Sequence, residues 1–347
     1  MNHLELHIIQ SVPVTCLNRD DLNSPKTAVF GGVQRARVSS QSWKRAIRSL
    51  AKELSPERFK GQRTRLLYEP LLNAMVEERV AEAKATEASK KIVDELVKID
   101  EKSKEIVKSK TLYFISPLEC ATIAKAFKET GDIKKSIKAV KGKHLVDAAD
   151  IALFGRMVAS DHSLTVEAAS MFSHALSTHR SDNEIDFFSA VDDGKAEDAE
   201  DAGAGITGTL EFNSSTYYRF AALNLDMLAD AEHLGALTLE ERKNVVSTFV
   251  EATIKAVPSA RKNTMNGNTL PVYVLGVCRA KGHPIQLINA FESPVKSSQG
   301  FTAKSVDLLK GEYAKLKDTW GVEAVFEKAI PDIDFKKFID GMVDHVI

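Results

Sequence analysis

Cysteine is scarce in this sequence: there are three in 347 residues, far apart and with no CxxC pair among them. This scarcity excludes a disulfide framework and gives no indication of a zinc ribbon, so a reducing compartment fits best. Long apolar runs are also missing, and the N-terminal segment lacks a basic stretch followed by an extended apolar core. We therefore expect a cytoplasmic protein with neither a signal peptide nor a membrane partner.

The sequence also lacks the short motifs of common nucleotide-dependent and hydrolytic enzymes. It contains no P-loop, no GxGxxG after a predicted strand and no GxSxG. Nucleotide hydrolysis, dinucleotide binding and α/β-hydrolase chemistry therefore have no support. The glycine-rich GAGITG at 203–208 lies in an acidic stretch, where a phosphate cradle is not expected. The sequence predicts no cofactor and no bound metal.

The net charge of −1 conceals an uneven distribution of charge along the chain. Residues 1–60 carry ten Lys and Arg against five Asp and Glu, whereas 181–201 carry nine acids and one Lys. The basic excess is densest at 17–48, where the basic residues are Arg19, Lys26, Arg35, Arg37, Lys44, Arg45 and Arg48. Such a cluster indicates a surface for a polyanion, and the acidic run could face a neighbouring copy. Solvated charge without a partner is the alternative for both segments.

A helix is expected directly after Ser39 and Ser40, either of which can serve as its N-cap. Lys44, Arg45 and Arg48 cluster over its first turns, where free backbone N–H groups also favour phosphate. A solvated basic helix face is the alternative interpretation.

The segment before this helix, 17–34, is expected to be a long loop because it holds Asn, Asp, Ser, Pro and two glycines. Gly31 and Gly32 allow either a close backbone approach or an ordinary turn. Further residues expected at the same phosphate groove are Arg19, Lys26, Ser39 and Gln41, although Ser39 could serve only as the cap.

Periodic patterns divide the rest of the chain into strands around a helical insertion. Residues 3–10 alternate apolar and polar side chains, as a half-buried strand does, and 57–170 are rich in helix-forming residues at helical spacing. TLYFISP at 111–117 is a strand or a buried connector. Further strands are expected at 171–179, 209–225 and 271–280, and further helices at 237–257 (opened by a Thr238–Glu241 capping box), 302–317 and 334–346.

A segment rich in Gly, Asp, Glu and Ala separates two of these strands, so residues 180–215 are expected to form a protruding β-hairpin. Without the insertion and this arm, the order is strand, helix, strand, strand, helix, strand. That order is typical of ferredoxin-like and RNA-recognition (RRM) folds. We therefore predict an α+β fold with an RRM-like palm from 1–56 and 171–347, a helical insertion at 57–170 and a hairpin at about 181–214.

Motifs spread over most of the chain resemble the CasC family, the backbone subunits of the Cascade effector in type I-E CRISPR systems. They are LNRDD…K-A-FGG…R-R-SSQS-KRA (17–46), DIALFGRM (150–157), HALSTH with IDFFSAVDD (174–193), YYRFAALNL (217–225) and VPSARKNT (257–264). The resemblance implies an RRM-like palm, helical fingers and a hairpin thumb. It also implies that copies of the protein oligomerise along CRISPR RNA beside other Cascade subunits, so that the guide pairs with target DNA in short segments.

Three further groups of residues are candidates for RNA contact. Met157 matches a family position whose side chain wedges against the guide bases, although a Met near a helix end is commonly part of a core. Phe187 and Phe188 lie amid acids on the predicted arm, where base stacking or packing against an adjacent subunit would explain them. Arg261 and Lys262 form a second basic loop, with solvated charge as the alternative.

A metal-dependent ribonuclease on the same fold is the alternative function. Asp20 and Asp21 lie beside the expected RNA path, and related backbone subunits of other CRISPR types use a loop aspartate for metal-assisted cleavage. Histidines that could supply an acid or base are His3, His7, His174 and His179. However, no third carboxylate has metal-ligand spacing, and His174 and His179 would face opposite sides of a strand. Structural pairing of the two aspartates, with Arg19 or a neighbouring copy, is the better explanation, so we expect no enzyme.

Overall fold

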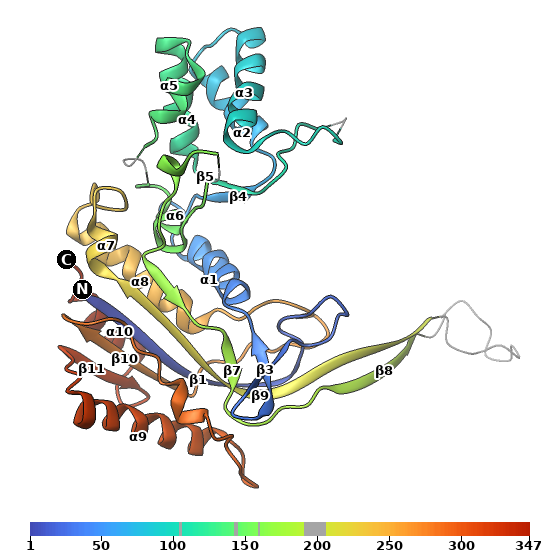
Figure 1. The fold of residues 1–347 in the computed structure, drawn as a ribbon, viewed down its shortest axis with the longest axis vertical. Coiled ribbons are helices and arrows are strands. Elements are labelled where there is room, and N and C mark those ends of the chain that lie inside the picture. The colour runs from blue at the N-terminus through green and yellow to red at the C-terminus, as the bar shows by residue number, and fades with distance from the viewer. Residues whose placement is uncertain (104–105, 142–144, 159, 191–205) are drawn as a thin grey trace, which may run out of the picture.

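The computed structural model describes residues 1–103, 106–141, 145–158, 160–190 and 206–347. The fold is mixed α and β, with one large antiparallel sheet at its centre (Figure 1). The order across the sheet is β11 (Phe326–Ile330), β10 (Tyr273–Arg279), β1 (His3–Thr15), β9 (Ile206–Asn224), β7 (Ala175–Ser177), β3 (Val33–Val38) and β2 (Thr27–Phe30). Two further strands pair with β9: β6 (Ser170–Phe172) and β8 (Glu184–Ala190).

Strand β1 lies at the centre of the sheet and is buried on both faces over its first eight residues. Leu4, Leu6 and Ile8 pack into the larger hydrophobic core, as the apolar half of the alternation predicts. The prediction of a half-buried strand was wrong, because His3, Glu5 and His7 on the other face are also buried. Alternation of polarity reports which side chains share a face, but it does not report whether another segment covers that face.

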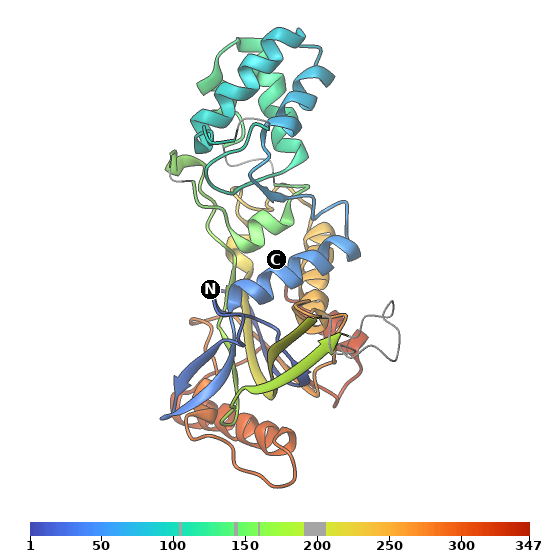
Figure 2. The same ribbon diagram turned by 90° about the vertical axis from the view of Figure 1, so that its right-hand side faces the viewer.

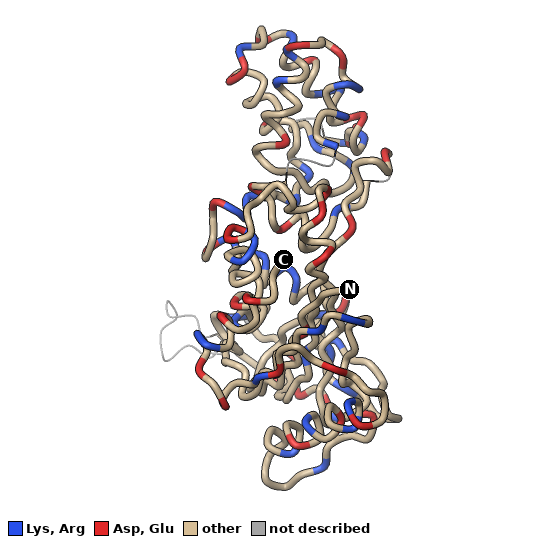
Figure 3. The backbone as a smooth tube through the Cα atoms, turned by 90° about the vertical axis from the view of Figure 1, so that its left-hand side faces the viewer, with Lys and Arg blue, Asp and Glu red and all other residues tan. Residues whose placement is uncertain are grey.

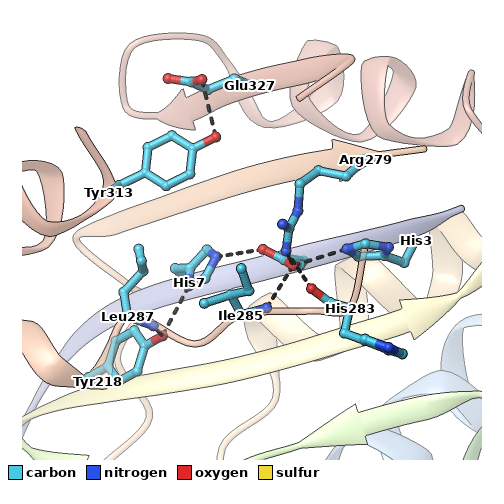
Figure 4. A network of polar contacts seen from close by, with 10 residues as sticks. His3, His7, Tyr218, Arg279, His283, Ile285, Leu287, Tyr313 and Glu327 are labelled. Atoms are coloured by element: carbon cyan, nitrogen blue, oxygen red, sulfur yellow. Dashed lines mark hydrogen bonds and ion pairs between the residues drawn. The ribbon is translucent and has the colours of Figure 1, made fainter. Parts of the chain in front are cut away.

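A buried polar network explains how the polar face of β1 is stable without water (Figure 4). One Glu5 carboxylate oxygen lies 3.1 Å from a ring nitrogen of His3, and the other lies 3.3 Å from one of His7. Glu5 also pairs with Arg279 of β10 and accepts the backbone N–H of Ile285. Burial alone would raise the pKa of Glu5, but hydrogen bonds from His3, His7 and Arg279 outweigh burial and lower it. The side chains of His3 and His7 are therefore engaged in hydrogen bonds within the fold.

Helices cover both faces of the sheet (Figures 1 and 2). One face packs against α1 (Ser40–Leu54), α8 (Leu239–Lys255) and α10 (Phe335–Val343), and the other against η2 (Ile288–Phe291) and α9 (Thr302–Trp320). The predicted caps are confirmed, since Ser39 accepts the backbone N–H of Ser42 at 3.3 Å and Thr238 forms a capping box with Glu241. Short elements complete this part: η1 (His162–Leu164) and α7 (Leu225–Ala229).

The helical insertion has a hydrophobic core of its own, separate from the two cores on the sheet. We call the helical insertion the fingers. Its helices are α2 (Tyr68–Glu77), α3 (Glu82–Val97), α4 (Pro117–Thr130) and α5 (Ile133–Lys138). Between them and the sheet lie β4 (Gln62–Thr64), β5 (Tyr113–Ile115) and α6 (Ala149–Phe154) (Figure 1). In Figure 2, α1 lies between the fingers at the top and the sheet below.

Strands β8 and β9 form an antiparallel hairpin that extends away from the rest of the molecule (Figure 1). The pairing runs from Glu184 opposite Phe212 to Ala190 opposite Ile206. Strand β9 continues from this hairpin into the sheet without a break, so the arm is anchored on a central strand. The acidic segment expected between these strands, roughly 192–208, lies mostly outside the described residues, which exclude 191–205.

The structure differs from the sequence prediction in three further places. Residues 17–34, expected as a loop, include β2, which turns into β3 through Gly31 and Gly32 at φ of +61° and +75°. These angles suit a two-residue hairpin turn, and a β-carbon at Gly31 would lie 1.6 Å from the Glu292 carbonyl oxygen. The stretch 171–179 forms two short strands instead of one, and the edge strand β11 was not predicted.

In the described part of the chain, no helix combines the length and apolarity that crossing a bilayer requires.

Candidate nucleic-acid interface

Two adjoining cavities run along α1, and we call them together the basic groove. The larger, of about 900 Å³, lies between α1 and two loops and is lined by Arg19, Arg45 and Lys262 among others. The second, of about 540 Å³, lies between α1 and the fingers and is lined by Ser39, Gln41, Lys44, Arg45, Arg48 and Met157 among others. Because Asn18, Ser42 and Arg45 line both cavities, the groove is continuous past the start of α1.

Helix α1 presents cations to the groove because its opposite side is apolar. Trp43, Ile47 and Ala51 are buried in the core, which leaves the intervening positions to face outward. Lys44 and Arg48 are half-buried: the Lys44 ammonium lies 5.4 Å from the centre of the Phe172 ring, and the Arg48 guanidinium carbon lies 5.0 Å from that of Phe114.

Burial lowers the pKa of both Lys44 and Arg48. A desolvated cation of this kind is stabilised by an arriving phosphate more than a fully hydrated one, because part of its desolvation cost has already been met in the folded protein. Arg45 is exposed and offers the least constrained cation of the three.

Five cations of the groove have no acidic partner within the described residues, whereas Lys255 and Arg156 of its lining pair with Glu251 and Glu119. None of Arg19, Lys44, Arg45, Arg48 and Lys262 has a carboxylate oxygen of that part of the chain within 4.0 Å. Figure 3 shows Lys and Arg interspersed with Asp and Glu over most of the backbone, so this local excess is not simply one end of a polarised molecule. An unpaired cluster of this type matches the backbone of a nucleic acid.

Arg63 and Asn18 are among the groove residues that escaped the sequence analysis. Arg63 of β4 is exposed and lines the cavity between α1 and the fingers, opposite the cations of α1. Asn18 joins the groove to the helix start, because its side-chain oxygen accepts the Ser39 N–H at 2.9 Å. A second basic cluster in GQRTR (61–65) was the only sequence signal for Arg63.

Among the basic residues that the sequence analysis associated with RNA or another polyanion, Lys26, Arg35 and Arg261 do not line the groove. Lys26 does not line the groove, although its backbone N–H donates to the Asn18 carbonyl at 2.9 Å. Arg261 has a left-handed backbone with φ of +54° and does not line the groove either, unlike its neighbour Lys262. Arg35 is buried, where its guanidinium donates to the carbonyls of Phe30, Ser177, Phe291 and Glu292. Arg35 therefore stabilises the sheet, and its guanidinium is not available to bind phosphate.

Phe187 and Phe188 are not brought into the groove, and they face opposite sides of the hairpin because strand side chains alternate. Phe188 is 39% exposed and covers Gly208, where an added β-carbon would lie 2.6 Å from its ring. Phe187 is 67% exposed and shares its face with Ile185. Of these two phenylalanines, Phe187 is therefore the one whose side chain is largely free to pack against another molecule.

The carboxylates and histidines considered for catalysis are separated. Asp20 accepts the backbone N–H groups of Leu22 and Ser24 at 2.8 and 3.0 Å, which makes it a turn-forming residue. Arg19 donates to the Asn23 side chain at 3.2 Å, and not to either aspartate. His179 is buried and accepts the Thr216 N–H, whereas His174 lies on the exposed side next to Arg37. No group of three or more His, Cys, Asp or Glu suited to a metal occurs among the described residues.

Both the sequence and the fold of this chain are similar to those of known proteins. A family model described as "CT1975-like protein" matches residues 4–336. This chain belongs to the CT1975-like family. Its structure is similar to a chain of a "CRISPR RNA-guided surveillance complex, pre-nicking", with a TM-score of 0.84 and 28% identity over 99% of this chain and 100% of that one. It is also similar to a chain of a "CRISPR RNA-guided surveillance complex", with a TM-score of 0.65 and 25% identity over the same shares. A search of curated protein sequences found no match.

Membership of the CT1975-like family confirms the resemblance that the sequence motifs indicated. The match to the first solved chain covers nearly the whole molecule, so the sheet, the fingers and the hairpin of this CT1975-like protein all fall within the compared region. The basic groove is therefore a feature of a chain built like a surveillance-complex subunit.

Proposed function

We propose that this CT1975-like protein is a noncatalytic, RNA-binding backbone subunit of a type I-E Cascade effector in the cytoplasm. Copies oligomerise along the CRISPR guide RNA, beside other Cascade subunits, and hold the guide for pairing with target DNA. The observation that carries the proposal is the basic groove, which Lys44, Arg45, Arg48, Arg19 and Lys262 line with no carboxylate of the described residues within 4.0 Å of any of the five. Contacts to phosphates from such a groove bind RNA with little preference for its sequence.

Two further observations support the proposal. The four strands β10, β1, β9 and β7 are neighbours in that order, with α1 and α8 on one face, which is compatible with an RRM-like palm. The hairpin carries the exposed apolar side chains of Ile185 and Phe187, and a two-stranded arm has no core of its own in which to bury them. Contact with RNA or with a neighbouring copy would cover these side chains.

A gel-shift titration with end-labelled, single-stranded RNA of guide length tests the proposal. Binding is measured at several salt concentrations for the wild type and for the triple variant Lys44→Gln, Arg45→Gln, Arg48→Gln. The wild type is expected to give a ladder of shifted species with intact RNA. The triple variant should bind more weakly, with a salt slope smaller by about 2, because each phosphate contact to a single strand contributes about 0.7.

The matched control removes three cations from α5, at the far end of the fingers (Figure 1): Lys134→Gln, Lys135→Gln, Lys138→Gln. It changes the net charge equally but should leave the slope as it is. Equal loss in both triple variants would overturn the assignment of the groove, and no shift of the wild type at low salt would overturn RNA binding. RNA shortened only when Mg²⁺ is present, and protected by changing Asp20 and Asp21 to Asn, would replace the proposal with a ribonuclease.

A further inference from the structure

Met157 is exposed in the basic groove although its chain neighbours are buried. Its side chain is 86% exposed, whereas Arg156 is 6% and Val158 is 1% exposed. It lines the same cavity as Arg48 and Arg63, so an unbranched apolar side chain stands among cations. A thioether in that place offers a surface for the flat face of a base whose phosphates the cations hold.

The backbone at this point is fixed by Arg156, whose guanidinium binds three separate segments. Its Nε donates to the Leu164 carbonyl at 3.1 Å, and its Nη1 donates to the Phe114 carbonyl at 3.0 Å. The same Nη1 lies 2.8 and 2.9 Å from the two carboxylate oxygens of Glu119. The backbone of Arg156 also exchanges two hydrogen bonds with Val166. The residue before Met157 is therefore held from both its main chain and its side chain.

Glu119 connects this clamp to the fingers. It is the N3 residue of α4, where its carboxylate accepts the backbone N–H of the N-cap, Ser116, at 3.1 Å in a capping box. Because the same carboxylate pairs with Arg156, the start of α4 and the turn that carries Met157 are joined through one buried group. On the other side of the turn, the Val158 N–H donates to the Thr165 hydroxyl at 3.2 Å.

From these contacts we propose that Arg156 is the positioning residue for Met157, clamped by Glu119 so that the fingers hold the Met157 side chain rigidly against the bases of the bound RNA. The inference rests on the proposed function and deepens it. A clamp is needed because an exposed side chain can displace a base only if its own backbone cannot yield. Phosphate affinity comes from other residues, so the clamp should affect how bases are arranged more than how tightly RNA is held.

The experiment places a fluorescent adenine analogue, which brightens when it is unstacked, at successive positions of a guide-length RNA. The wild type should brighten the analogue at regular intervals, and Met157→Ala should flatten that pattern. Arg156→Gln is expected to flatten it in the same way while the dissociation constant for RNA changes by less than about threefold, because phosphate contacts remain. The matched control is Arg65→Gln, which breaks another arginine–carboxylate pair of the fingers, to Asp100, and should keep the wild-type pattern.

Removing one partner of a buried ion pair leaves the other charge unpaired, so Arg156→Gln could fail to fold. The double variant Arg156→Met, Glu119→Met removes both charges and keeps apolar bulk, yet it also removes the donors to Leu164 and Phe114. A folded variant of either kind that retains the wild-type pattern would overturn the clamp. Wild-type protein that binds no RNA would overturn the proposed function itself, whereas bound RNA with an unchanged pattern in Met157→Ala would overturn the role of Met157, and with it the clamp, but not the proposed function.

Discussion

The guanidinium carbon of Arg219 lies 3.7 Å from the centre of the Trp43 ring, in the interior between β9 and α1. Arg219 is buried, and its hydrogen bonds within the described residues go to the Gln10 side chain and the Thr253 carbonyl, so no carboxylate there neutralises it. Burial lowers the pKa of Arg219 to about 9. The electron-rich ring face takes the place of an acid and fixes the helix that carries the groove cations onto a central strand.

Trp43→Leu should lower the free energy of unfolding by about 3–5 kcal/mol, because it removes a large buried side chain and leaves Arg219 without its aromatic partner. Trp43→Phe keeps an aromatic face and should cost about 1–2 kcal/mol. Urea unfolding followed by circular dichroism measures both. A loss for the Leu variant no larger than that for the Phe variant would contradict the cation–π role.

The hairpin aromatics should separate into two phenotypes. Phe188→Ala uncovers Gly208, so amide exchange in β8 should quicken by up to about fivefold, since a cross-strand pair contributes at most about 1 kcal/mol. Phe187→Ala should leave exchange unchanged and instead reduce the ladder of RNA-bound species, because we propose that its exposed ring contacts RNA or a neighbouring copy. Hydrogen exchange by mass spectrometry and the gel shift separate the two effects. Identical behaviour of the two variants would contradict the opposite facing of these side chains.

Asp150, at the start of α6, should make stability depend on pH. Its Oδ1 accepts the Gly61 N–H at 3.2 Å, its Oδ2 has no partner within the described residues, and burial raises its pKa from 3.8 to about 6 despite the opposing effect of Arg48. The folded state therefore binds more protons than the unfolded state between these values. Stability contributed by the neutral carboxyl is lost as pH rises through about 6.

Asp150→Asn keeps the side chain neutral and retains an acceptor for Gly61. It should raise the free energy of unfolding by about 1–3 kcal/mol at about pH 8, with a much smaller gain at about pH 4, where both states are increasingly protonated. Urea titrations at the two pH values provide the measurement. A gain of equal size at both would show that the effect is not ionisation of Asp150.

Arg63 should contribute to RNA binding from the fingers side of the groove. Arg63→Gln is expected to reduce the salt slope by about 0.7, as the loss of one phosphate contact would, and to change stability by less than about 0.5 kcal/mol because the side chain is exposed. Arg79→Gln, an exposed change in the fingers away from the groove, is the control. If the control lowered the slope equally, the effect would be general charge and not a contact.

Features that depend on a few neighbouring residues were predictable from the sequence. The caps at Ser39 and Thr238 formed as expected, because a capping hydrogen bond joins residues three apart in the chain. The concentration of cations at the start of α1 was also visible, since one helix presents Lys44, Arg45 and Arg48 to the same side.

The chain by itself thus determined the helical character of its main helices, the N-caps of α1 and α8, the membership of its family and a basic segment beside a helix start. Only the tertiary structure decided which basic residues are available. Arg35 is buried by carbonyls that include one 142 residues away, whereas Arg63 reaches the groove of α1 from the fingers. It also covered the polar face of β1 and turned Phe187 and Phe188 to opposite sides of the hairpin. Local patterns specify which side chains share a face, but burial of that face depends on segments that are distant in sequence and meet only when the chain folds.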